Sequence, residues 1–169
     1  IILSLEVIAA EDVSLDMREI VVDKIIEILD QKTTENEKIK ISALRCALTL
    51  KIPDYVPLKN LINSPNRLLR NHAYACAMGV GINGKKVDQD VICHIFNNSF
   101  NSDNSKNEHE AQAALIALCS NEENATSILN ELTKNTENLI LLLGSLENDE
   151  KEKNWVIEII VKILMNSAK

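Results

Sequence analysis

The chain carries one helical pattern three times, as K-I-S-A-L-R-C-A-L-T in residues 40–49, R-N-H-A-Y-A-C-A-M-G in residues 70–79 and E-A-Q-A-A-L-I-A-L-C in residues 110–119. The copies align without gaps, and alanine occupies the fourth and eighth position of each. Residues four apart lie on one face of an α-helix, where alanine lets a neighbouring helix approach closely. We therefore expect three repeated helices that bury Ala43, Ala47, Ala73, Ala77, Ala113 and Ala117.

A second amphipathic stretch precedes each copy, which predicts that the repeating unit is a pair of helices. In residues 17–29, apolar side chains recur at the period of an α-helix and charged side chains lie mostly on the other side. The apolar side of this stretch consists of Ile20, Val21, Ile25, Ile28 and Leu29. The other predicted helical stretches are 55–62, 88–96, 122–132 and 137–146, and a weaker fourth copy begins at Lys153 with Val156 and Ile160 in the alanine places.

Residues that begin and end helices stand between these stretches. A hydroxyl followed three residues later by a carboxylate forms a capping box, which bonds the free N–H groups of a helix start. Gly81 and Gly84 offer the left-handed backbone that closes a helix. The predicted helix starts are the capping boxes Thr34–Glu37 and Ser120–Glu123 and the pair Ser64–Pro65.

The composition independently favours an all-α fold. A length of 169 residues, with 46% hydrophobic and 25% charged residues, fits one globular domain. A sandwich or barrel needs frequent turn residues and aromatic strand faces, whereas this chain has 4 Gly, 3 Pro and 3% aromatic residues. We interpret residues 1–169 as a single helical repeat domain. Because the chain opens at Ile1 in what reads as the middle of a helix, we interpret it as part of a longer protein.

The net charge narrows the class of binding partner, and the cysteines narrow the cellular compartment. A net charge of −7 opposes binding to nucleic acid or an anionic membrane, whose affinity depends on phosphate neutralisation. No apolar run approaches the ~20 residues that a bilayer span needs, and no signal-peptide pattern occurs. The cysteines lie far apart in helical stretches, which favours reduced thiols in a cytoplasmic or nuclear protein: Cys46, Cys76, Cys93 and Cys119.

Helix pairs that repeat along a chain stack on one another, because no single pair can bury its own apolar face. We therefore expect a right-handed α-solenoid of stacked antiparallel helical hairpins. Residues 64–70, S-P-N-R-L-L-R, followed by Ala73, Ala77 and Gly79, resemble the second helix of a HEAT repeat, whose turn reads D-P-x-x-x-V-R. The resemblance, or a related armadillo-like one, implies that Arg70 takes the arginine place, which pairs with an aspartate of the preceding turn. Ser64 stands in the aspartate place.

A weaker resemblance concerns residues 73–84, A-Y-A-C-A-M-G-V-G-I-N-G, which look like a proteasome/cyclosome repeat. Both families are typically protein-binding scaffolds rather than enzymes. The resemblance therefore implies a protein partner and no catalytic residue, metal or cofactor. We predict that the contact residues lie at loop or early-helix positions beside the clearest copy: Arg67, Asn71, Lys85 and Lys86.

Two other functions stay open. One is a HEAT-like accessory domain, or a nucleic-acid- or cofactor-processing enzyme domain, with a pocket lined by His72, Cys76 and Cys93, residue types that could also hold zinc. Against it, Cys76 takes the core position of Cys46, which favours a small buried hydrophobe. The other is a purely structural segment of a large assembly subunit.

Overall fold

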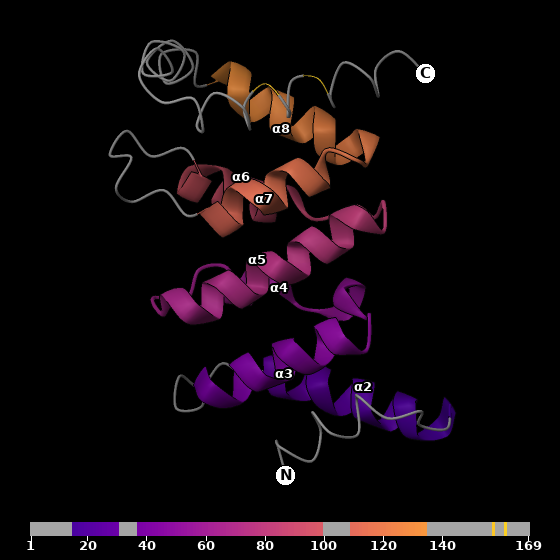
Figure 1. Ribbon diagram of the computed structural model, residues 1–169. Coiled ribbons are helices and arrows are strands. Elements are labelled where there is room, and N and C mark those ends of the chain that lie inside the picture. Colours follow the sequence, from indigo (N-terminus) through magenta and orange to yellow (C-terminus); the bar gives the residue numbers. More distant parts are fainter. Residues whose placement is uncertain (1–14, 31–36, 100–108, 135–156, 158–160, 162–169) are drawn as a thin grey trace. The chain divides into compact units, whose positions relative to one another are not determined.

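A computed structural model describes residues 15–30, 37–99, 109–134, 157 and 161 (Figure 1). All regular secondary structure within these residues is helical, which confirms the all-α prediction. The chain divides into two compact units, Ile1–Gly79 and Val80–Lys169, and the boundary falls inside one helix. The capping residue Thr34, the stretch 137–146 and the alanine places of the fourth copy lie outside the described residues.

The first unit contains α2 (Leu15–Asp30), α3 (Glu37–Thr49), a 3-10 helix (Pro53–Tyr55), α4 (Leu58–Leu61) and most of α5 (Arg67–Ile82). Helices α2 and α3 pack against each other. The face of α2 that is buried contains Val21, Ile25 and Leu29, as predicted. Ile20 is 64% exposed, so its assignment to this face was wrong.

Helices α3 and α5 bury the same positions of the repeat. In each helix two adjacent residues are buried, the next residue is not, and the following two are buried again. This spacing places the four buried side chains on one face of the helix. The thiol of Cys76 on α5 lies 4.0 Å from the carbonyl oxygen of Leu44 on α3, so the two repeated helices touch through this face. Burial of the alanines in the first two copies is confirmed; the buried sets are Ala43, Leu44, Cys46 and Ala47, and Ala73, Tyr74, Cys76 and Ala77.

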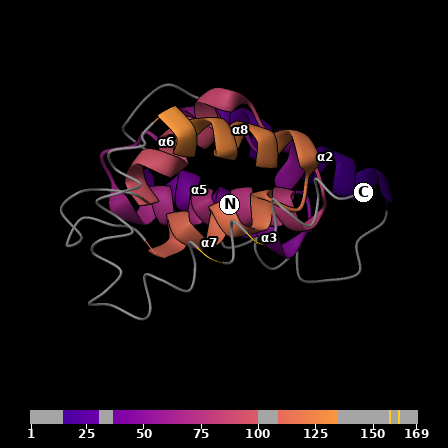
Figure 2. The same ribbon diagram turned by 90° about the horizontal axis from the view of Figure 1, so that it is seen from above.

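The second unit contains the last turn of α5, α6 (Gln89–Ser99), α7 (His109–Leu118) and α8 (Glu122–Lys134). Helix α6 packs against both α7 and α8, as Figures 1 and 2 show. Its buried face includes Val91, Ile92, Ile95 and Phe96. The helices predicted over residues 88–96 and 122–132 are therefore present, with ends that differ by a few residues.

The third copy of the repeat has a different register from the predicted one. Ala113 is exposed, whereas Ala114 is fully buried. The buried residues of α7 therefore match those of α3 and α5 when the third copy begins at residue 111 instead of residue 110. Gly81 of α5 explains the close packing here, because a Cβ at Gly81 would lie 2.5 Å from the backbone carbon of Ala117. The matching buried residues of α7 are Ala114, Leu115, Ala117 and Leu118.

Helix α5 ends at a left-handed glycine. Gly84 has a φ of +65°, its N–H donates to the carbonyl of Gly81, and the N–H of Lys85 donates to the carbonyl of Val80. This pair of hydrogen bonds is a Schellman motif, which confirms the prediction for Gly84. Gly81 itself is helical and buried, so its predicted role in closing the helix was wrong.

Asparagine, and not serine, caps two of the helices. The side-chain oxygen of Asn121 accepts hydrogen bonds from the N–H groups of Glu123 and Asn124 at the start of α8. The predicted cap, Ser120, is one residue too early. Asparagine and serine are similarly good at an N-cap, so the sequence pattern alone does not separate neighbouring candidates.

Candidate functional site

The start of α5 is built by a short polar turn. The side-chain oxygen of Asn66 accepts hydrogen bonds from the N–H groups of Leu68 and Leu69, so Asn66 is the N-cap. Ser64, the predicted cap, instead accepts a bond from the N–H of Asn66. Arg70 reaches back and donates to the carbonyl oxygens of Ser64 and Pro65, at 2.7 and 3.1 Å. The guanidinium of Arg70 therefore holds the turn that precedes its own helix.

An exposed face runs along α5 from this turn. Leu68 is 55% exposed and Met78 is 36% exposed, although both are large apolar side chains. Arg67 is exposed, whereas Asn71 and Ala75 are half-buried. The spacing from Leu68 through Asn71 and Ala75 to Met78 alternates three and four residues, which keeps the four side chains on one side of a helix. We call Arg67, Leu68, Asn71, Ala75 and Met78 the α5 face.

The α5 face lies on a helix with positive charge and no carboxylate. Its sequence, R-L-L-R-N-H-A-Y-A-C-A-M-G-V-G-I, holds two arginines and no acidic residue. Every other described helix of eight residues or more contains at least one aspartate or glutamate. Within the described part of the chain, no carboxylate forms an ion pair with Arg67. A carboxylate from α3 does reach the start of this helix, where Glu37 accepts a hydrogen bond from the side-chain amide of Asn66.

The predicted contact residues fall into two groups. Arg67 and Asn71 lie one turn apart on the α5 face in the first unit. Lys85 and Lys86 are exposed neighbours in the turn between α5 and α6 in the second unit. Lys86 forms an ion pair with Glu123, and the hydrogen bond from Lys86 to this carboxylate raises the pKa of the lysine. Of the two lysines, Lys86 is therefore already engaged within its own unit.

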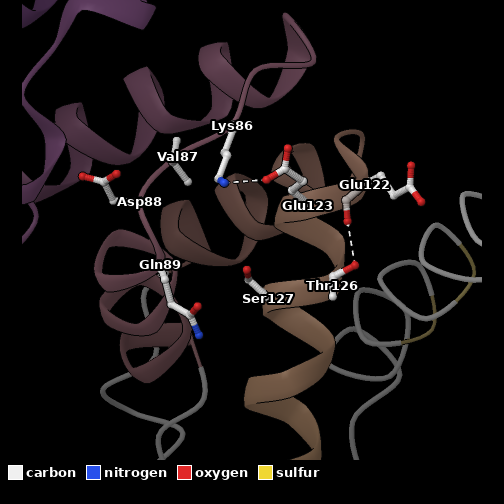
Figure 3. Close-up of a pocket in the computed structure, with 8 residues that line it drawn as sticks. All are labelled: Lys86, Val87, Asp88, Gln89, Glu122, Glu123, Thr126 and Ser127. Atoms are coloured by element: carbon white, nitrogen blue, oxygen red, sulfur yellow. Dashed lines mark hydrogen bonds and ion pairs between the residues drawn. The ribbon is translucent and has the colours of Figure 1, made fainter.

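A polar groove opens beside Lys86 (Figure 3). It has a volume of about 520 Å³ and lies between the start of α6 and the first half of α8. Figure 3 shows the side chains of Lys86 and Glu123 pointing toward each other. Sequence patterns do not predict this groove, because its two walls are far apart in the chain. The lining residues are Lys86, Val87, Asp88, Gln89, Glu122, Glu123, Thr126 and Ser127.

A buried amide fixes the wall of the groove. Asn124 is fully buried; its nitrogen donates to the carbonyl of Lys85 at 2.8 Å, and its oxygen accepts from the N–H of Val87 at 3.0 Å. Asn121 donates to the carbonyl of Gly84 at 3.0 Å. The N-cap residue of α8 and one side chain within α8 thus satisfy backbone groups of the turn before α6. These polar groups have a structural role, because each is paired within the protein.

The residues of the alternative enzymatic pocket each have a structural environment. The ring Nδ1 of His72 lies 2.8 Å from the carbonyl oxygen of Leu68 and donates to it, since a carbonyl only accepts. Burial raises the pKa of the Cys76 thiol from 9.0 to about 12, so this thiol stays protonated at neutral pH. Partial burial, followed by a hydrogen bond with Glu131, raises the pKa of Cys93. Thiolate is the reactive form, so neither cysteine is an activated nucleophile.

No metal centre occurs among the described residues, since no group of three or more His, Cys, Asp or Glu side chains converges there. None of the described helices combines the length and the hydropathy that crossing a bilayer requires. All four cysteines are free thiols. No family model, curated protein or solved structure matches the chain.

Proposed function

We propose that this chain is a non-catalytic scaffold that binds another protein, built as a right-handed α-solenoid of the HEAT or armadillo kind. The shared register of α3, α5 and α7 supports a repeat architecture. In the first unit α3 touches α5 through Cys76 and Leu44, and in the second unit the last turn of α5 touches α7 through Gly81. Side-by-side contact of the repeated helices is what stacked helical repeats require.

The observation that carries the binding function is the α5 face. Apolar side chains that gather on one part of a protein surface mark interaction sites, and Leu68 and Met78 are exposed on the same side of one helix. Arg67 stands beside Leu68, and arginine is one of the residue types enriched in binding hot spots. Arg67 and Asn71, two of the predicted contact residues, belong to this face.

The second group of predicted contacts has a smaller part in this proposal. Lys86 is paired with Glu123, so a partner has to compete with an internal carboxylate for its ammonium. The side chain of Lys85 is exposed beside it. We assign Lys85 and Lys86 to a peripheral part of the surface, where charge affects the association rate more than the affinity.

The proposed setting is a reducing compartment, the cytoplasm or the nucleus. Four free cysteines, three of them buried, support it. The net charge of −7 supports a protein partner over nucleic acid. The protonated thiol of Cys76 and the helix-bonded ring of His72 support a non-catalytic chain.

Affinity capture with paired surface variants tests the proposal. The bait is the whole chain, and the test variant carries Leu68→Ser and Met78→Ser, which remove exposed apolar groups and leave the buried face of α5 unchanged. The control is Ile20→Ser on α2, a large apolar residue outside the α5 face that is more exposed than either Leu68 or Met78. Circular dichroism checks that all three proteins have the same helix content.

We expect a partner that the unaltered chain and the control retain, and that the double variant loses by about tenfold or more. The purified partner has to bind the unaltered chain and the control variant, and has to bind the double variant more weakly by a similar factor. If the double variant retains the same proteins in the same amounts, or if the chain retains none, the α5 face is not a binding surface. Self-association of the chain through this face would instead support a structural segment.

A further inference from the structure

We propose that Asn83 is a site of spontaneous deamidation, and that the side-chain amides of Asn121 and Asn124 set the rate of this reaction by holding the adjacent turn closed. The inference concerns the turn between α5 and α6, and it does not depend on the proposed binding function. The observations that carry it are the pair Asn83–Gly84, the exposure of that pair, and the hydrogen bonds of the turn.

Asn83 is followed by a residue without a side chain. It is the only asparagine of the chain that precedes glycine, whereas Asn63, for comparison, precedes serine. A Cβ on the following residue hinders the approach of its backbone nitrogen to the asparagine side chain, and glycine has no Cβ. Asn83 and Gly84 are both exposed, and nothing lies within 4 Å of the place where a Cβ of Gly84 would stand. Water therefore reaches this pair, and a ring that forms there has room.

The reaction consumes only water. After hydroxide has taken its proton, the backbone nitrogen of Gly84 attacks the side-chain carbonyl carbon of Asn83. A bond between these two atoms forms, the bond to the side-chain amide nitrogen breaks, and ammonia leaves with a proton from the solvent. A water molecule then opens the cyclic imide: cleavage at the side-chain carbon gives aspartate, and cleavage at the main-chain carbonyl carbon gives isoaspartate. In sum, asparagine and water give a carboxylate and ammonium, and nothing is oxidised or reduced.

The closed turn slows the attack. The N–H of Gly84 donates to the carbonyl oxygen of Gly81 at 2.9 Å, so the proton that has to leave is engaged. Two amides hold the same turn from α8: Asn121 donates to the carbonyl of Gly84, and Asn124 donates to the carbonyl of Lys85. The backbone nitrogen of Gly84 is released for attack when the turn opens locally, and these bonds stabilise the closed form. The rate of deamidation therefore reports how often the turn opens.

The product changes both the charge and the length of the turn. A carboxylate in place of the Asn83 amide lies at the C-terminal end of α5, where the partial charge of a helix is negative, so it is unfavourable there. Isoaspartate also lengthens the main chain by a methylene group between the carbonyl of Val80 and the N–H of Lys85, which the Schellman motif joins. We expect the modified turn to open more readily than the original one.

Timed incubation of the whole chain in water enriched in a heavy oxygen isotope tests the inference. Peptide mapping by mass spectrometry measures the replacement of amide by acid at each asparagine, and the heavy oxygen marks acid that formed during the incubation. Liquid chromatography separates the aspartate and isoaspartate forms of a peptide. Asn63, which is exposed and precedes serine, is the control within the same molecule.

Three variants test the role of α8. Asn124→Ala removes the buried amide, and Asn130→Ala is the matched control at an exposed position of the same helix. Asn121→Ser keeps an N-cap oxygen for α8 and removes the amide that bonds Gly84, so the test does not depend on the folding of Asn124→Ala alone. Circular dichroism checks that each variant has the helix content of the unaltered chain.

We expect Asn83 to gain the acid faster than Asn63, with isoaspartate among its products, and the rate to rise with pH because the deprotonated nitrogen attacks. Asn124→Ala should raise the rate at Asn83 by about tenfold, since the population of the open turn grows when its bonds are lost. Asn121→Ser should raise it less, and Asn130→Ala should leave it unchanged.

Two results would overturn the site itself: conversion of Asn83 that is no faster than that of Asn63, or formation of aspartate without isoaspartate. A rate at Asn83 that neither Asn124→Ala nor Asn121→Ser raises would overturn the control by α8. All of these results are independent of the capture experiment with Leu68 and Met78.

Discussion

The turns that follow α3 and α5 share one backbone geometry but differ in what supports them. Each is a Schellman motif with a left-handed residue, Lys51 with a φ of +57° in the first unit and Gly84 with a φ of +65° in the second. The first turn runs into buried apolar residues, Ile52 and Pro53 among them. The second turn is held by side-chain amides of α8, above all that of Asn124.

The difference shows that a local backbone motif and its tertiary support are separate properties. The hydrogen bonds of a Schellman motif are formed within a few residues, so the motif can occur in either environment. The surroundings differ: the first turn leads directly into the buried apolar residues Ile52 and Pro53, whereas side-chain amides bond the backbone of the second. Substitutions that separate backbone geometry from tertiary support therefore have different expected effects in the two units.

The largest effect is expected at Gly81, close to the second turn. A Cβ at this position would lie 2.5 to 2.7 Å from backbone atoms of Ala117 and Leu118, and a backbone cannot move aside cheaply. Gly81→Ala should lower the free energy of unfolding by about 3 kcal/mol, measured by urea denaturation. Gly79→Ala is the matched control, because a Cβ there meets the side chain of Pro53 at 2.9 Å and not a backbone. A larger loss at Gly79 would contradict this account of α5 packing.

The next largest effect is expected at Asn124. Asn124→Ala removes two hydrogen bonds and leaves the carbonyl of Lys85 and the N–H of Val87 without this partner. We expect a loss of about 2 kcal/mol in the free energy of unfolding and faster amide hydrogen exchange at Val87. Asn130→Ala, the same change at an exposed position of α8, should have little effect. Unchanged exchange at Val87 would mean that the amide does not hold the turn.

A smaller and opposite pair of effects is expected at the left-handed residues themselves. Lys51→Gly removes a side chain from a left-handed backbone and should raise the free energy of unfolding by up to about 1 kcal/mol, whereas Gly84→Ala should lower it by about 1 kcal/mol. Nothing lies within 4 Å of a Cβ at Gly84, so the loss there comes from the backbone alone. Urea denaturation of both variants, with Lys51→Ala as the neutral control, measures the pair. Changes of the same sign would refute the shared geometry.

The smallest effect is expected from the ion pair at the groove. Lys86 and Glu123 have side chains that are 62% and 66% exposed, and exposed ion pairs contribute little to stability. Lys86→Met should therefore leave the melting temperature nearly unchanged. Because Glu123 raises the pKa of Lys86, any contribution is present at neutral pH and is lost as the pH rises through that pKa. A clear drop in the melting temperature of Lys86→Met at neutral pH would mean that the ion pair, rather than Asn124, stabilises the second turn.

Local sequence signals predicted most of the helices and missed several of the residues that end or cap them. Helical periodicity located the stretches that became α2, α6 and α8, because burying one face of a helix requires apolar residues at that period. Caps were less well predicted. Ser64 and Asn66, like Ser120 and Asn121, are neighbouring residues that can both accept a bond from a free N–H group, and the exact position at which the chain enters the helix selects one of them.

The candidate site was only partly predictable. Arg67 and Asn71 were chosen as helix-start residues beside the clearest copy of the repeat, and they lie on the α5 face. Leu68 and Met78 were not chosen, since an apolar residue in an amphipathic helix is expected to be buried. Their exposure depends on how wide a stripe of α5 its neighbours cover, and that width is a property of the packed molecule.

The amino-acid sequence alone determined the helical class, the repeat and the small side chains that let repeated helices touch, because these follow from composition and from periodicity within single segments. Tertiary structure decided the register of the third copy. Residues 111–119 contain four alanines, two of them adjacent at 113 and 114, so more than one face of α7 could accept a close neighbour. Contact between the backbone of α7 and Gly81 selected the face with Ala114 and Ala117 and left Ala113 in solvent.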